Sequence, residues 1–146
     1  MHLTTLGISL TALLLLAAAP NSPAPKQEPE HITIQHVLIG FTGSVPGKNI
    51  TRTQDEAKKL AEEIFARAKK GENFDELVKK YTDDAAPGIY SMANNGVTPA
   101  AGEYARNRMV AAFGDAGFPL QVGEFGMASY DKAKSPYGWH IVKRLK

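Results

Sequence analysis

Residues 31–39 read HITIQHVLI, and residues 53–71 read TQDEAKKLAEEIFARAKKG. The first segment is rich in β-branched residues, and its alternate positions share one side, which predicts a β-strand. In the second segment Thr53 and Glu56 have the spacing of a capping box, and apolar residues follow at helical intervals up to Gly71. These two patterns predict a strand followed, after a glycine-containing loop, by a long amphipathic helix.

The rest of the chain predicts a small mixed fold. A second capping pattern opens a short helix over 73–81, and residues 82–102 are irregular because they are dense in Ala, Pro, Gly and Asn. Residues 103–116 have apolar spacing that is compatible with a helix, whereas 124–130 and 139–145 are typical of strands. A strand, then helices, then strands predicts an α+β fold with a small antiparallel sheet.

The first 30 residues differ in composition from the remainder. Residues 3–19 are apolar and end in small residues, which is typical of a secretory signal peptide or of a single membrane anchor that is not cleaved. Residues 20–30 contain four prolines and predict an extended tether. We therefore expect an exported protein, periplasmic or otherwise extracytoplasmic, with a folded domain at 31–146 that is free or attached to a membrane through residues 3–19.

Composition excludes several classes of function. The chain has 17 basic and 15 acidic residues, which are interspersed, so no charged surface for nucleic acid is expected. It has no cysteine, which excludes disulfides, thiolate zinc sites and a cysteine nucleophile. Nothing in the pattern suggests a coiled coil or a large exposed apolar face, and this predicts a monomer.

Two histidines lie on predicted strands. His36 is in the middle of the first strand and His140 opens the last one. A single histidine on an apolar face is usually a core residue, but if these two strands are neighbours the histidines form a buried pair, in which one imidazole stays neutral. A metal site with Asp83 and Asp84 is a weak alternative, because no H-x-x-x-H or H-E-x-x-H spacing is present.

Met109 and Phe113 are four residues apart, so they share one face of the predicted helix. Ordinary core packing explains this spacing. The alternative is a pocket for a compact apolar ring such as that of proline.

Five segments together resemble the parvulin-type peptidyl-prolyl cis–trans isomerases over residues 31–146. They are QHVLI around His36, the capped helix from Thr53, GENFDELVKKYTDD ending at Asp84, MVAAFGDAGFPLQVGE from Met109, and YGWHIVKRL around His140. The resemblance implies a four-stranded antiparallel sheet surrounded by about four helices. It also implies an isomerase without a cofactor that acts on X-Pro bonds of exported or envelope polypeptides and assists their folding.

The resemblance also implies roles for individual residues. His36, Asp84 and His140 occupy catalytic positions, Met109 and Phe113 are walls of the proline pocket, and Ser135 occupies a hydroxyl position able to hydrogen-bond a histidine.

This sequence departs from the family pattern at several positions. Residues 87–96, PGIYSMANNG, replace the stretch that supplies a pocket leucine, so Tyr90 or Met92 would substitute for it, and Tyr137 stands where some members carry serine. The basic cluster of phosphate-selective relatives is reduced to Lys48 and Arg52. These changes motivate a rival hypothesis, a peptide-binding chaperone or scaffold module that keeps the groove with little or no catalysis.

Overall fold

The computed structural model describes residues 27–146. The predicted signal or anchor at 1–19 and the tether residues 20–26 lie outside this range. Among the described residues, no helix has the length and apolar character needed to cross a membrane.

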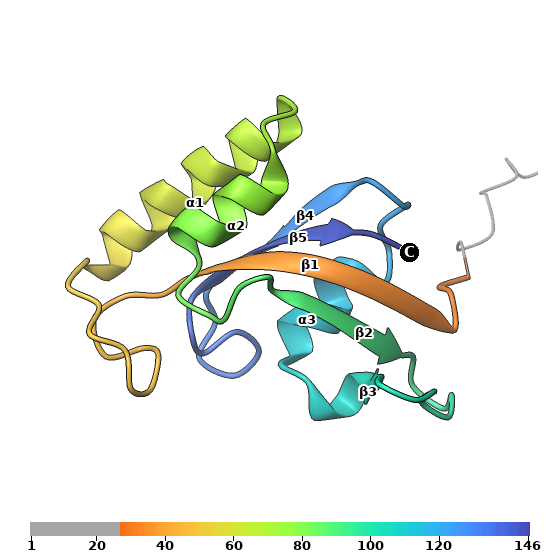
Figure 1. Ribbon diagram of the computed structural model, residues 1–146. Coiled ribbons are helices and arrows are strands. Elements are labelled where there is room, and N and C mark those ends of the chain that lie inside the picture. The colour runs from red at the N-terminus through yellow and green to blue at the C-terminus, as the bar shows by residue number, and fades with distance from the viewer. Residues whose placement is uncertain (1–26) are drawn as a thin grey trace, which may run out of the picture.

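A five-stranded sheet forms the centre of the fold (Figure 1). Its strands follow the order β3-β2-β1-β5-β4, so the first and last strands of the chain are hydrogen-bonded neighbours in the middle of the sheet. All pairs are antiparallel except β2–β3. The strands are β1 (His31–Ile39), β2 (Ile89–Ala93), β3 (Tyr104–Ala105), β4 (Phe125–Ala128) and β5 (Trp139–Arg144). The predicted α+β class is correct, with one short, parallel strand beyond the expected four.

Helices cover both faces of this sheet. The helices α1 (Gln54–Lys69) and α2 (Phe74–Tyr81) lie on one face, and α3 (Ala111–Gly117) lies on the other (Figure 1). A 3₁₀ helix, η1 (Arg106–Arg108), precedes α3. Because side chains alternate along a strand, β1 directs Val37 and Ile39 to the α1–α2 core and Ile32 and Ile34 to the α3 core.

The long helix begins as its sequence predicts. The Thr53 hydroxyl accepts a hydrogen bond from the Glu56 amide at 3.2 Å, and the Glu56 carboxylate accepts one from the Thr53 amide at 2.7 Å. This reciprocal pair satisfies amide groups that the first turn of the helix leaves free. The capping box predicted at Thr53 is therefore confirmed.

Two predicted segments need correction. Residues 103–116 do not form one helix, because Met109 has an extended backbone, Val110 has φ −54° and ψ 127°, and α3 begins only at Ala111. The Arg106 side chain crosses so close to Gly114 that a Cβ atom there would lie 2.4 Å from Arg106 Nε, an arrangement that a continuous helix would not provide. The segment 82–102, expected to be irregular, contains β2.

Candidate active site

The two strand histidines lie side by side on the α3 face of the sheet. In the β1–β5 register His36 is opposite Val142 and Leu38 is opposite His140, so the two imidazoles are diagonal neighbours. Their Nδ1 atoms are 3.2 Å apart, and each residue is 1% exposed. The predicted buried histidine pair is confirmed.

Asp84 extends this pair towards the surface. Its Oδ2 atom accepts hydrogen bonds from His36 Nε2 at 2.9 Å and from the Tyr90 hydroxyl at 2.7 Å. The bond from His36, followed by that from Tyr90, holds the pKa of the Asp84 carboxyl well below its usual range. Burial, together with the Asp84 charge, raises the pKa of Tyr90 to about 12. Asp84 is therefore a carboxylate and Tyr90 is its neutral donor.

Proton positions along this chain follow from its hydrogen bonds. His36 Nε2 donates to Asp84, and His140 Nδ1 then donates to His36 Nδ1. This assignment leaves His140 Nε2 as an unpaired acceptor, since the described residues give it no partner. The opposite assignment would bury an unpaired donor, which is rarer in proteins. Burial, with the adjacent His36 as the second cause, lowers the pKa of His140 to about 3, so its imidazole is neutral.

A cavity of about 340 Å³ opens beside the Asp84–His36–His140 chain. Its volume lies at the lower end of the range for small-ligand sites, and most of its lining is apolar. The Phe113 ring forms one wall, 4.7 Å from the His36 ring and 4.9 Å from the His140 ring. Twelve residues line the cavity: His36, Leu38, Val45, Pro46, Asp84, Tyr90, Arg108, Met109, Val110, Phe113, Tyr137 and His140.

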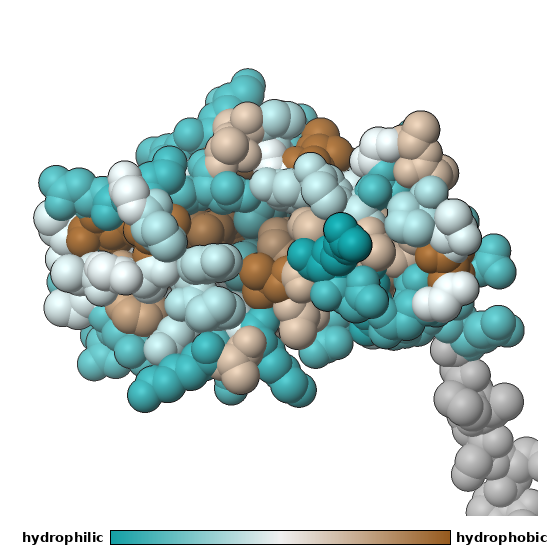
Figure 2. All heavy atoms as spheres, turned by 90° about the horizontal axis from the view of Figure 1, so that it is seen from below, coloured by the Kyte–Doolittle hydropathy of each residue, from teal (hydrophilic) through white to brown (hydrophobic). Residues whose placement is uncertain are grey.

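Figure 2 views the molecule from the side that carries α3. Hydrophobic residues reach this surface in several separate patches, and hydrophilic residues surround them. An apolar ligand group could thus be buried locally on a face that is otherwise polar.

The structure places the remaining predicted site residues in different environments. Tyr90 and Tyr137 line the cavity, whereas Met92 is fully buried in the α3 core and does not reach it. The Ser135 hydroxyl donates to the Gly138 carbonyl at 2.6 Å, so it stabilises the turn before β5 instead of bonding a histidine. Of the two substitutes expected for the family's leucine, only Tyr90 is positioned to act as one.

Sequence reasoning missed five lining residues. Leu38 could have been found, because period two places it on the same face as His36. Arg108 and Val110 flank Met109 in the sequence, but the expected continuous helix would have directed them elsewhere. Val45 and Pro46 lie in the loop between β1 and α1, which gave no periodic signal.

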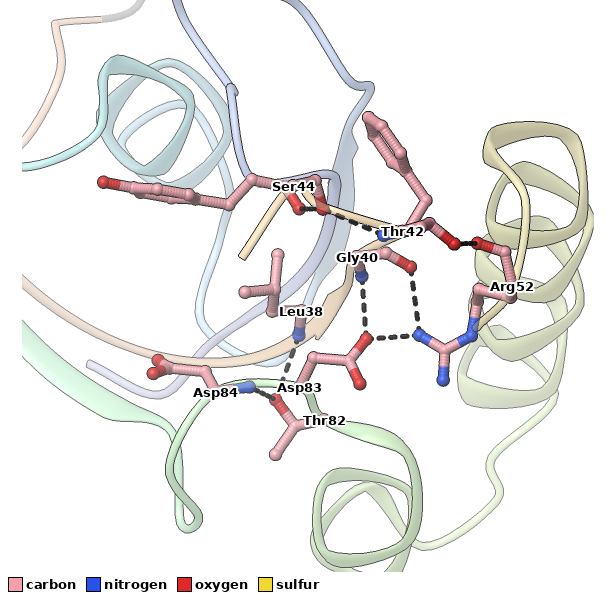
Figure 3. Close-up of polar contacts among 10 residues, drawn as sticks. Leu38, Gly40, Thr42, Ser44, Arg52, Thr82, Asp83 and Asp84 are labelled. Atoms are coloured by element: carbon pink, nitrogen blue, oxygen red, sulfur yellow. Dashed lines mark hydrogen bonds and ion pairs between the residues drawn. The ribbon is translucent and has the colours of Figure 1, made fainter. Parts of the chain in front are cut away.

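Asp83 and Asp84 are neighbours in the sequence, but they support different parts of the cavity. In Figure 3 the Asp83 side chain points towards Arg52, while Asp84 points away from it. Asp83 Oδ2 accepts from the Gly40 amide at 2.8 Å and forms a short ion pair with Arg52. Arg52 also donates to the Gly40 carbonyl at 3.0 Å. The two ends of the loop that carries Val45 and Pro46 are thus joined to the turn that carries Asp84.

Thr82 fixes the same turn to β1 (Figure 3). Its hydroxyl accepts from the Leu38 amide at 3.1 Å and from the Asp84 amide at 3.2 Å. The Asp83 amide donates to the Leu38 carbonyl at 2.8 Å. The Thr82 hydroxyl and one backbone bond therefore fix the position of Asp84 relative to the strand that holds His36.

The site therefore consists of a buried histidine pair, a carboxylate that is hydrogen-bonded to it, and a small apolar cavity. The chain was compared with known proteins. The family model described as "PPIC-type PPIASE domain" matches residues 22–146. This chain belongs to the PPIC-type PPIase family. The foldase protein PrsA of Bacillus subtilis (strain 168) is 38% identical to the chain over 114 residues, which are 77% of this chain and 34% of that protein.

Other relatives agree with this membership. The peptidyl-prolyl cis-trans isomerase pin1 of Schizosaccharomyces pombe is 31% identical over 124 residues, 84% of this chain and 64% of that protein. The chaperone SurA of Pseudomonas fluorescens is 28% identical over 116 residues, 80% of this chain and 23% of that protein. The chain spans about a quarter to a third of the length of these foldases and chaperones: 23% of the SurA, 27% of the PrsA of Geobacillus kaustophilus and 34% of the PrsA of Bacillus subtilis.

Solved structures share the fold. The solution structure of TbPIN1 matches with a TM-score of 0.60 at 24% identity, over 80% of this chain and 98% of that one. The parvulin-like architecture expected for this PPIC-type domain is confirmed.

Proposed function

We propose that this chain is a peptidyl-prolyl cis–trans isomerase that assists the folding of exported polypeptides. The observation that carries the proposal is the small apolar cavity whose inner wall is formed by Asp84, His36 and His140. The family membership and the isomerase, foldase and chaperone relatives support it.

The reaction needs no nucleophile and no cofactor. An X-Pro bond prefers trans by only about 0.5–1 kcal/mol, but rotation breaks amide resonance and has a barrier of about 18–20 kcal/mol. A site that binds the twisted amide better than either planar isomer lowers this barrier. About 5.5 kcal/mol of such differential binding gives roughly a ten-thousandfold acceleration.

The cavity offers separate surfaces for the two sides of the bond. Met109 and Phe113 hold the prolyl ring, and the preceding carbonyl rotates near Asp84. Resonance gives the oxygen of a planar amide a partial negative charge, and twisting reduces it. The Asp84 carboxylate therefore disfavours the planar amide more than the twisted one, and its bonds to His36 and Tyr90 fix its position.

The proposed substrates are proline-containing polypeptides outside the cytoplasm. This follows from the signal or anchor predicted at residues 3–19. The chain acts as a monomer in this proposal, because a single cavity contains all the groups that the reaction uses.

Exchange NMR on short X-Pro peptides tests the activity. We expect the protein to accelerate cis–trans exchange. The substitution Asp84→Asn keeps the side-chain shape but removes the charge, so it should lower kcat/KM roughly a hundredfold. The matched control is Asp55→Asn, which changes an exposed acid at the start of α1 and should leave kcat/KM unchanged. Peptide binding without faster exchange would contradict the isomerase and favour a binding module.

A further inference from the structure

Arg108 is a cavity residue that neither the fold nor the proposed reaction uses. It is exposed, it lines the cavity immediately before Met109, and no hydrogen bond or ion pair holds its guanidinium within residues 27–146. The other arginines in that range all have partners. Those partners are Asp83 for Arg52, Glu72 for Arg67, Glu28 for Arg106 and the Leu120 carbonyl for Arg144.

The backbone that carries Arg108 is well anchored. Arg106, two residues earlier, donates to Glu28 at 2.6 Å and to Asn94 at 2.9 Å, and its guanidinium lies 4.5 Å from the centre of the Phe118 ring. The Met109 amide closes η1 by donating to the Arg106 carbonyl at 3.2 Å. Arg108 therefore presents a free positive charge from a fixed turn, not from a loose loop.

We propose that Arg108 makes the site selective for an acidic residue adjacent to the proline. This inference rests on the proposed isomerase function and names its preferred substrates. A guanidinium binds a carboxylate through parallel, charge-assisted hydrogen bonds. Met109 and Val110 line the cavity beside Arg108 and offer apolar surface to the rest of the same substrate.

The charges of the cavity also orient the substrate. Asp84 is the acidic residue of the lining and Arg108 is its arginine. The Asp84 carboxylate is directed to His36 and Tyr90, and it repels a second carboxylate. A substrate acid is consequently drawn to Arg108 while the rotating amide stays beside Asp84.

The test compares Glu, Gln and Lys next to proline in two peptide series, one with the variable residue before proline and one with it after. Exchange NMR gives kcat/KM, and titration of the protein resonances gives the affinity of each peptide. In one of the two series we expect kcat/KM and affinity to be about fivefold higher for the Glu peptide than for the Gln peptide, and lower for the Lys peptide than for the Gln peptide. Arg108→Gln should bring the Glu-to-Gln ratio to about 1. The ratio of the unmodified protein should fall as salt rises, because salt screens the exposed charge.

Lys59→Gln is the matched control, since it removes an exposed cation from α1, on the opposite face of the sheet, and Lys59 does not line the cavity. It should leave the Glu-to-Gln ratio unchanged. Equal rates for Glu and Gln peptides, or a ratio that survives Arg108→Gln, would overturn the role of Arg108 and leave the isomerase intact. If no peptide is isomerised, the proposed function fails, and the affinity ratio from the titration still decides the role of Arg108.

Discussion

His140 has two neighbours with opposite effects on its charge. Burial and the adjacent His36 ring disfavour the imidazolium form, whereas the more distant Asp84 charge favours it. The first two effects dominate, which lowers the pKa of His140 to about 3. An imidazole that is neutral at neutral pH can hold the His36 tautomer that donates to Asp84, so His140 positions the carboxylate through a residue that lies between them.

This burial predicts a pH-dependent stability. In the unfolded chain His140 has a pKa of about 6.5, so it is protonated at a pH at which the folded state keeps it neutral. The free energy of unfolding therefore falls as the pH drops below 6.5. Between pH 7 and pH 5 this group should lower the free energy of unfolding by about 2 kcal/mol. The depressed pKa of Asp84 acts only at lower pH, since its contribution is lost as the pH falls below about 4.

Urea unfolding at several pH values measures this effect. We expect His140→Gln to flatten the decline between pH 7 and pH 5, whatever it does to stability at pH 7. Parallel curves for the two proteins would mean that His140 is protonated in the folded state.

At the scale of elements, the loop between β1 and α1 depends on a contact that is distant in sequence. Asp83 binds both Gly40 and Arg52, the two ends of the loop that forms one cavity wall (Figure 3). Asp83→Ala should lower the free energy of unfolding by about 1–3 kcal/mol, because it leaves the Gly40 amide without its acceptor and removes the ion pair with Arg52.

The same substitution should act on peptide binding more than on the chemical step. We expect KM to rise several-fold while kcat changes little, since His36 and Tyr90 still hold Asp84. Asp55→Ala, which removes an exposed acid from α1, is the control for stability and KM. A selective fall in kcat would instead indicate that Asp83 acts through Asp84.

Elements with a clear local signal were predictable. The strand at 31–39 alternates cleanly, and the helix after Thr53 has both its capping box and its apolar stripe. The strand β2 was missed because it has only five residues, with Met92 and Ala93 buried in succession instead of alternating. The prediction of one helix over 103–116 was wrong. Arg106 is held by Glu28 and Asn94, and this places it in η1, which an extended Met109 separates from α3.

The candidate site was predictable where strand periodicity determines it. His36 and His140 meet because β1 and β5 are neighbours. Tyr90, which lies opposite Ile34 on the missed strand β2, was instead expected from the family resemblance. The turn that holds Ser135 and the loop that holds Val45 have no period. These two segments are joined by a tertiary hydrogen bond from the Ser44 hydroxyl to the Tyr137 carbonyl at 2.8 Å, a contact without a periodic signal in the sequence.

At the scale of the whole molecule, the segment just before β1 packs on the domain. The Asn94 amide donates to the Glu30 carbonyl at 2.8 Å, and its side chain donates to the Pro29 carbonyl at 3.0 Å. Glu28 pairs with Arg106, which also contacts Asp115 of α3 at 3.3 Å. The end of the proline-rich segment is therefore joined to the same arginine that supports the cavity wall.

The Glu28–Arg106 pair should make a measurable contribution to stability. Glu28→Gln should lower the free energy of unfolding by about 1 kcal/mol, because a short, charge-assisted bond is lost while Asn94 and Asp115 still hold Arg106. Urea unfolding of the full chain measures the loss, with Glu30→Gln as the matched control, since within residues 27–146 only the backbone of Glu30 is hydrogen-bonded. Equal stability of the two variants would mean that the segment merely lies against the domain, whereas a selective loss with Glu28→Gln would make it part of the cavity's support.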